Sequence, residues 1–143
     1  MSDAPQTGSA EIVEGGGYAV APSLDAVGEG YGFRKVRKEL GVTAFGANVI
    51  VMPPGYQSDA HSHEKQEELY FVHKGTVEFT FGDGTNQEIG EGGAARVDPQ
   101  TQRSMRNTSE TEDAVYLCVG GKDGYVGRDG IAPEGETRGP VAG

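Results

Sequence analysis

The sequence predicts an all-β domain, built as a barrel or a sandwich of short strands. Apolar and alternating segments recur at near-regular spacing, and clusters of glycine and proline separate them. No segment has the apolar periodicity of a long amphipathic helix. The chain of 143 residues contains 24 glycines, so turns and tails should form a large share of it.

We expect the first 17 residues, MSDAPQTGSAEIVEGGG, to form a disordered arm, because they are mainly small, polar or glycine. They lack the basic start and apolar stretch of a signal peptide. No run of the chain reaches the ~18 apolar residues of a membrane span. We therefore predict one β-domain over residues 18–120 and a flexible, glycine-rich tail over residues 121–143.

A basic cluster follows the arm. It consists of Arg34, Lys35, Arg37 and Lys38. Such a cluster can contact an anionic partner, but we favour a solvated edge strand whose charges deter pairing between sheets. The net charge of −10 disfavours nucleic acid and anionic membranes, because binding to phosphate groups needs clustered positive charge.

The next predicted strand, residues 43–52, ends at two prolines and a glycine, and a pair of histidines follows this turn. His61 and His63 are two residues apart, so both can point to the same face of a strand. Glu68 can add a carboxylate from the following strand. Two imidazoles and a carboxylate suit divalent iron, manganese, nickel, cobalt or zinc. The alternative is a polar surface loop with two solvated histidines.

Two further strands are predicted at residues 68–74 and 76–81, joined as a hairpin that turns at Lys74 and Gly75. Alternation from Glu68 places Tyr70 on the same face as the carboxylate and His73 on the opposite face. A Gly-Asp-Gly turn at residues 82–84 then leads into a short segment that ends at position 90.

The spacing from position 55 to position 75 is G-x5-H-x-H-x4-E-x6-G. It resembles the first signature of the cupin family, with every marked position filled. The resemblance covers roughly residues 33–120, which would form the domain core, and implies a small jelly-roll β-barrel with the metal in its mouth. It also implies a homodimer that pairs through strands near the start of the chain.

The second signature of that family, G-x5-P-x-G-x2-H-x3-N, supplies a histidine as fourth ligand, and here the segment 92–107 departs from it. Aligned on Asn107, the segment has Arg103 at the histidine position. A shift by one residue puts Ser104 there instead. We prefer the first register, because Arg103, Met105 and Asn107 then alternate along one strand face.

Arg103 is not a metal ligand, since a guanidinium has no lone pair to donate. In the first interpretation His61, His63 and Glu68 hold a divalent metal and leave other positions open. Arg103 would then bind a small anionic substrate as a charged anchor.

In this first interpretation Tyr70 and Asn107 are further substrate-binding candidates, and the protein is a metal-dependent dioxygenase or isomerase. In the second interpretation Arg103 pairs with Glu68 in place of the metal, which leaves a metal-free binding or regulatory module. In the third the barrel is a structural or interaction module without a ligand.

The last predicted strand, residues 114–121, contains the one cysteine, Cys118. We interpret Cys118 as a small buried hydrophobe, because no activating pattern accompanies it. A single cysteine agrees with a reducing cytoplasm. The tail carries three apolar residues that could anchor it, Tyr125, Val126 and Ile131. It could cover the pocket mouth or extend into solvent, and the sequence leaves both open.

Overall fold

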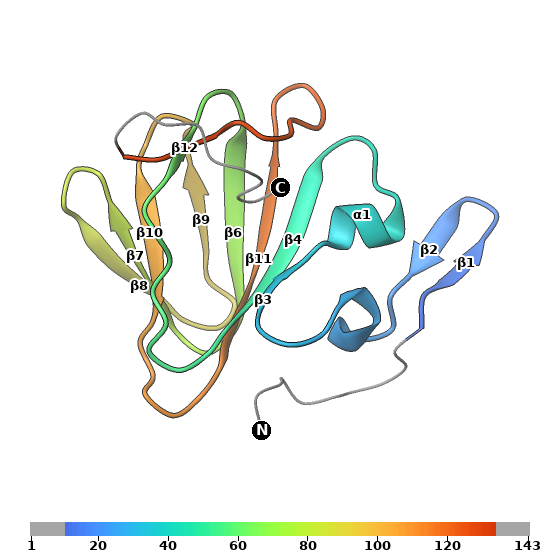
Figure 1. Cartoon of the computed structure of the whole chain (residues 1–143), viewed down its shortest axis with the longest axis horizontal. Coiled ribbons are helices and arrows are strands. Elements are labelled where there is room, and N and C mark those ends of the chain that lie inside the picture. The colour runs from blue at the N-terminus through green and yellow to red at the C-terminus, as the bar shows by residue number, and fades with distance from the viewer. Residues whose placement is uncertain (1–10, 134–143) are drawn as a thin grey trace.

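Two antiparallel sheets face each other in the computed structural model, which describes residues 11–133 (Figure 1). The larger sheet has the order β3 (Gly32–Arg34), β4 (Gly46–Met52), β11 (Ala114–Gly121), β6 (Glu67–Lys74) and β9 (Ala94–Val97). The smaller has the order β10 (Arg103–Asn107), β7 (Val77–Phe81) and β8 (Asn86–Ile89). The predicted all-β jelly roll is thereby confirmed.

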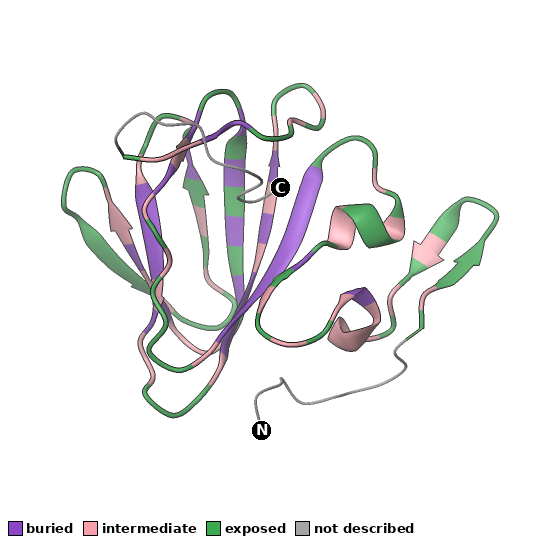
Figure 2. Ribbon diagram, viewed as in Figure 1, coloured by how far each residue is buried: buried purple, intermediate pink, exposed green. Residues whose placement is uncertain are grey.

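The core fills the space between the two sheets. Strict alternation along β6 turns Glu68, Tyr70 and Val72 inward and leaves Leu69 and His73 exposed, which Figure 2 shows as alternating bands. This is the alternation that the sequence predicted. The apolar centre consists of Ile50, Met52, Tyr70, Val72, Val77, Phe79, Val97, Met105, Ala114, Tyr116 and Cys118.

The predicted hairpin at Lys74 and Gly75 is wrong. Strand β6 pairs with β11 and β9, whereas β7 pairs with β10 and β8, so the chain crosses here from one sheet to the other. Gly75 has a φ of 79°, which favours glycine. A Cβ at Gly75 would also lie 3.2 Å from atoms of Ala114. Alternation shows which face a residue occupies but not which strand lies beside it.

The N-terminal segment packs outside the larger sheet. Strands β1 (Val13–Gly15) and β2 (Tyr18–Val20) form a hairpin where the sequence predicted an arm over residues 1–17; residues 1–10 of that arm lie outside the described residues. The 3-10 helix η1 (Leu24–Val27) and helix α1 (Val36–Leu40) follow. Leu24 and Val36 from these helices cover Val49, Val51 and Val115 on the outer face of the sheet.

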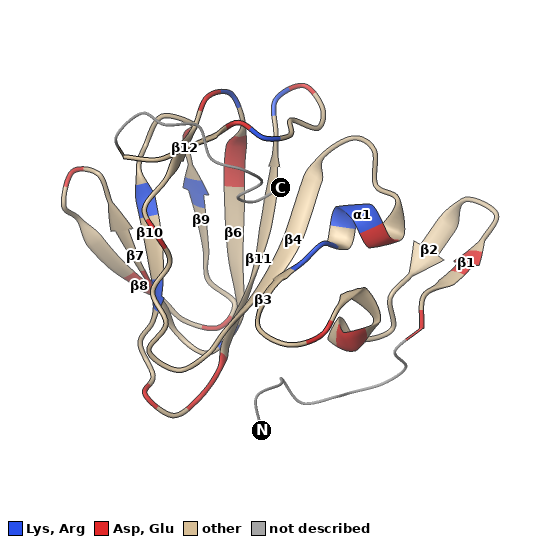
Figure 3. Cartoon of the chain, viewed as in Figure 1, with Lys and Arg blue, Asp and Glu red and all other residues tan. Residues whose placement is uncertain are grey.

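The basic cluster is not the solvated edge strand that the sequence predicted. Only Arg34 lies in β3, and its side chain is buried, where it donates to Asp25 Oδ1 at 3.2 Å and to the Gly30 carbonyl at 2.9 Å. The remaining cations precede or lie within α1, as Figure 3 shows. No helix within residues 11–133 has the length and apolar character needed to cross a membrane.

Candidate metal centre

His61, His63 and Glu68 form a buried cluster near the start of β6. One ligand atom from each residue lies within 4.8 Å of the other two. His63 belongs to β5 (Ser62–His63), His61 forms a β-bridge with Arg103 of β10, and Glu68 lies near the start of β6. The side chains that the sequence grouped by spacing therefore lie together, and His61 is the most exposed of the three at 4%.

Each imidazole is held through one ring nitrogen. His63 Nδ1 lies 2.8 Å from Asp129 Oδ1, to which it donates, and the His61 ring hydrogen-bonds to the backbone of Asp59. Within the described residues the Nε2 atoms of His61 and His63 have no hydrogen-bond partner. An imidazole fixed in this way directs the lone pair of its other nitrogen into the site.

The two oxygens of Glu68 have different surroundings. Oε1 accepts hydrogen bonds from the hydroxyl of Tyr70 and, at 3.1 Å, from Arg103 Nη2. His63 Nε2 lies 3.3 Å from the same oxygen, a close contact without the geometry of a hydrogen bond. Oε2 is buried and has no hydrogen-bond partner among the described residues. One oxygen is therefore anchored by protein donors, and the other remains available to a ligand.

The electrostatics of the cluster give His61 and Glu68 the protonation states that metal ligands need. Burial, together with the charge of Arg103, lowers the pKa of His61 to about 4. Burial raises the pKa of Glu68, but the neighbouring His63 ring, the Arg103 charge and the Tyr70 hydroxyl outweigh it and lower the pKa to about 2. At neutral pH His61 is therefore a neutral imidazole and Glu68 a carboxylate.

Arg103 is fully buried, and each of its three nitrogens has a protein partner. Besides Nη2 on Glu68, Nε donates to the Tyr70 oxygen at 3.2 Å, and Nη1 donates to the Thr101 carbonyl at 2.6 Å. The inward direction of this side chain agrees with the alignment register preferred above. These contacts do not favour the prediction that Arg103 anchors a substrate, because each of its nitrogens already donates to a protein oxygen.

Asn107, predicted to bind substrate, lies at the other end of β10 from Arg103. Its Nδ2 donates to the carbonyls of Met52, Pro53 and Glu112, and its Oδ1 accepts from the Ser109 N–H. These bonds connect two loops at the end of the barrel away from the cluster, so they indicate a structural role. Tyr70, by contrast, lies beside Glu68 as predicted, with its hydroxyl on Oε1.

Sequence reasoning missed two neighbours of the cluster. Asp129 reaches His63 from the glycine-rich C-terminal segment, where no spacing pattern links it to the histidines. Cys118 is buried as predicted, but its place beside Glu68 and Tyr70 was not foreseen. Burial and the charge of Glu68 raise the pKa of the Cys118 thiol, so it is not a thiolate at neutral pH.

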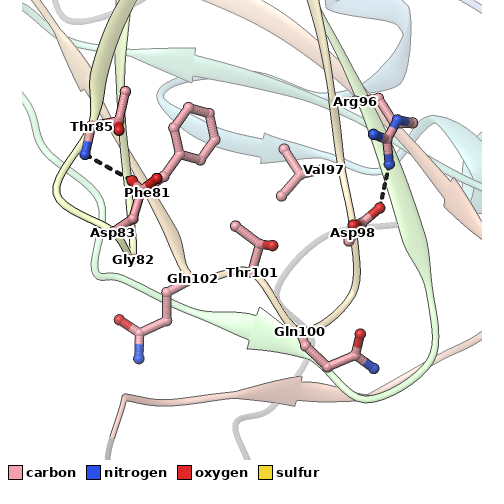
Figure 4. Close-up of a pocket in the computed structure, with 10 residues that line it drawn as sticks. All are labelled: Phe81, Gly82, Asp83, Thr85, Arg96, Val97, Asp98, Gln100, Thr101 and Gln102. Atoms are coloured by element: carbon pink, nitrogen blue, oxygen red, sulfur yellow. Dashed lines mark hydrogen bonds and ion pairs between the residues drawn. The ribbon is translucent and has the colours of Figure 1, made fainter.

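Two hollows lie outside the cluster. One, of about 650 Å³, opens between the β7–β8 turn and the chain before β10, with Phe81, Val97 and the Arg96–Asp98 ion pair in its wall (Figure 4). Another, of about 280 Å³, is mostly apolar and includes Tyr56 and Tyr116. The three cluster residues line neither of these two, but Glu68 lines another hollow, of about 530 Å³.

Comparison with protein families shows to which family this chain belongs. A family model of the cupin domain matches residues 48–120. The chain belongs to the cupin family. The match includes the three cluster residues and Arg103 but ends before Asp129. A search of curated proteins found no match.

Several solved structures share this cupin fold. A cupin protein from Bacteroides fragilis is 24% identical, with 64% of this chain and 77% of that chain covered and a TM-score of 0.58. A sugar phosphate isomerase of the cupin superfamily from Silicibacter pomeroyi is 19% identical over 77% and 79%, with a TM-score of 0.58. A DMSP lyase from Ruegeria pomeroyi is 21% identical over 66% and 46%, with a TM-score of 0.56. At these identities the similarity shows the fold alone.

Proposed function

We propose that this cupin binds a divalent metal ion through Nε2 of His61, Nε2 of His63 and Oε2 of Glu68. One observation carries the proposal: these buried atoms lack hydrogen-bond partners within residues 11–133, while the other polar atom of each side chain is bonded. A buried polar atom without a partner costs about 1–3 kcal/mol. Three of them on adjacent ligand-type side chains favour a bound cation.

Arg103 and the metal need not compete for Glu68. The guanidinium bonds to Oε1, and the proposed metal ligand is Oε2. Arg103 would hold the carboxylate in place and offset its charge before the metal arrives. Arg103 could replace the metal or accompany it, and both interpretations start from the same geometry. In that geometry Arg103 and the metal would each bind a different oxygen of Glu68.

The charges around the cluster support an anionic small molecule as its ligand. A dication together with Arg103 would outweigh the carboxylates of Glu68 and Asp129 by one positive charge, with His61 neutral. Such an excess in a buried site attracts a carboxylate or phosphate group. We place this group at a vacant metal position, because each nitrogen of Arg103 already donates to a protein oxygen.

The proposed activity is that of a metal-dependent enzyme, an isomerase or a dioxygenase, acting on a small anionic molecule. A bound divalent ion with three protein ligands would supply Lewis-acid or redox chemistry at its vacant positions. Within the chain, Tyr70 and Arg103 orient Glu68, and Asp59 and Asp129 hold the two imidazoles. A metal-free binding or regulatory module is the second candidate, favoured by the 3.1 Å ion pair between Arg103 and Glu68.

Elemental analysis of protein purified without a polyhistidine tag separates these candidates. We expect about one equivalent of a divalent metal in the wild type and none in the double variant His61→Ala, His63→Ala. A wild type that stays empty after incubation with iron, manganese, nickel, cobalt or zinc would support the metal-free module and refute the enzyme. His73→Ala is the control, because His73 lies on the exposed face of β6.

A further inference from the structure

Part of the C-terminal segment contacts the candidate metal centre. Residues 122–131, here called the strap, leave β11 and return to the barrel, where β12 (Gly130–Ile131) pairs with β5. In this pairing Gly130 lies opposite His63. Figure 1 shows β12 at the end of the barrel where β6 begins. The strap lies beyond the cupin-family match, which ends at residue 120.

Asp129 makes the main polar contacts of the strap. Its Oδ1 accepts from His63 Nδ1 at 2.8 Å and from Gln66 Nε2 at 2.6 Å. Its Oδ2 accepts from the backbone N–H groups of Lys65 and Gln66, each at 2.9 Å. The carboxylate thus joins one candidate metal ligand to the loop that leads into the strand carrying another, Glu68.

The backbone next to Asp129 is strained in a way that these contacts must offset. Arg128 has a φ of 55°, a left-handed conformation that non-glycine residues rarely adopt. Such a conformation persists where its surroundings stabilise it, often at functional sites. Four hydrogen bonds to one buried carboxylate provide this stabilisation.

We propose that Asp129 is a positioning residue for the metal centre, and that docking of the strap and binding of the metal stabilise each other. The inference rests on the proposed function. A carboxylate on Nδ1 keeps the proton there and aims the Nε2 lone pair of His63 into the site, which raises metal affinity. By linkage, the factor by which docking strengthens metal binding equals the factor by which metal strengthens docking.

The first test measures the affinity of the full chain for Zn²⁺ against a competing chelator. Asp129→Asn and Asp129→Ala should weaken binding about 10- to 100-fold. Asp123→Asn is the matched control, because Asp123 lies in the same strap, is exposed, and loses the same charge. Its φ of 55° is one that asparagine tolerates, so its affinity should equal that of the wild type.

The second test follows the strap itself. Trypsin can cleave after the exposed Lys122 and Arg128, and Zn²⁺ should slow both cleavages in the wild type but much less in Asp129→Ala. The ¹⁵N NMR signals of His63 in the metal-free protein should show the Nδ1–H tautomer in the wild type and a mixture in Asp129→Asn. A purely structural role for Asp129 would leave this tautomer unchanged.

The outcomes separate the two proposals. A wild type that binds none of the tested metals overturns the proposed function. A wild type that binds Zn²⁺ with the same affinity as both Asp129 variants overturns the positioning role alone. Protection from trypsin that is equal in the wild type and in Asp129→Ala overturns the coupling. Should Asp129→Ala fail to fold, Asp129→Asn and the His63 tautomer still decide the inference.

Discussion

At the scale of single residues, Arg103 is the departure from the cupin pattern with the largest electrostatic effect. The family histidine would bind the metal directly, whereas Arg103 bonds to the oxygen of Glu68 that the proposed metal does not use. A buried ion pair contributes little net stability, but removal of one partner leaves the other charged and unsolvated. The stability of the metal-free protein should therefore depend strongly on Arg103.

We predict that Arg103→Met destabilises the metal-free protein by about 3–5 kcal/mol, because Glu68 loses its counter-charge. Saturating metal should recover part of this loss, since the dication then compensates the carboxylate. Urea unfolding with and without metal measures both effects. Arg106→Met, on the same strand, breaks a partly exposed ion pair with Glu78 and should cost less than ~1 kcal/mol. An equal cost for both substitutions would contradict the prediction.

His61 should make the stability of the metal-free protein depend on pH. Its pKa is lowered from 6.5 to about 4 in the folded state, so between these values the unfolded chain binds the proton more tightly. The contribution of His61 is complete above pH 6.5 and is lost as pH falls toward 4, by up to ~3 kcal/mol. Urea unfolding at pH 7, 5.5 and 4.5 tests this.

The control for this pH dependence is a pair of histidine variants. His61→Gln should flatten the fall in unfolding free energy between pH 6.5 and 4.5, because it removes the titrating group. His73→Gln should leave the fall as in the wild type, since His73 is exposed on the outer face of β6. A wild-type free energy of unfolding that stays constant over this range would refute the assignment.

The sequence was a good predictor of the residues that share a strand or a motif. The two-residue spacing of His61 and His63 reports a shared face, and the cupin pattern adds Glu68, so the three members of the buried cluster could be predicted. Asp129 could not, because it meets His63 only through the pairing of β12 with β5. Asn107 shares the inward face of Arg103, but facing inward does not indicate which end of the barrel a residue reaches.

At the scale of elements, the same argument explains which strands were predicted. Strands β4, β6, β7 and β11 carry alternating or apolar runs that the sequence shows directly, whereas β10 was placed through the cupin resemblance. The pairing of β6 with β11 and β9 was missed, because pattern encodes faces rather than neighbours. Strand β12 has two residues, too few for any periodicity.

Strand β11 pairs with β6, and Gly120 of β11 has little space for a side chain. Gly120 lies opposite Glu68, and a Cβ there would lie 2.4 Å from Gln66 Oε1 and 3.1 Å from Glu68 Cγ. We predict that Gly120→Ala displaces the side chains of Gln66 and Glu68, lowers the unfolding free energy by about 1–3 kcal/mol and weakens metal binding. Thermal unfolding and a Zn²⁺ titration measure these effects.

Gly90→Ala is the control for the Gly120 substitution. A Cβ at Gly90 would meet nothing within 4 Å, so both stability and metal affinity should stay near the wild-type values. If Gly120→Ala also kept wild-type values, the side chains of Gln66 and Glu68 would have to make room for the methyl group at no cost, and the role of Gly120 as a close contact would be wrong.

At the scale of the whole molecule, segments outside the family match complete the barrel on two sides. The N-terminal helices cover the outer face of β4, and the strap reaches the candidate metal centre through Asp129. The chain is also acidic, with a net charge of −10, which raises the local concentration of cations around it. An acidic surface can bind metal ions without a specific site. A test of the whole protein must therefore distinguish binding to the surface from binding at the candidate centre.

We therefore predict that divalent metal stabilises the wild type by mass action but not the double variant His61→Ala, His63→Ala. At a free metal concentration 100 times Kd, a single site adds about 2.7 kcal/mol to the unfolding free energy. The thermal midpoint should rise by several degrees and return to its starting value when a chelator is added. Both proteins have the same surface carboxylates, so binding to that surface would raise both midpoints equally, whereas binding at the centre raises only that of the wild type.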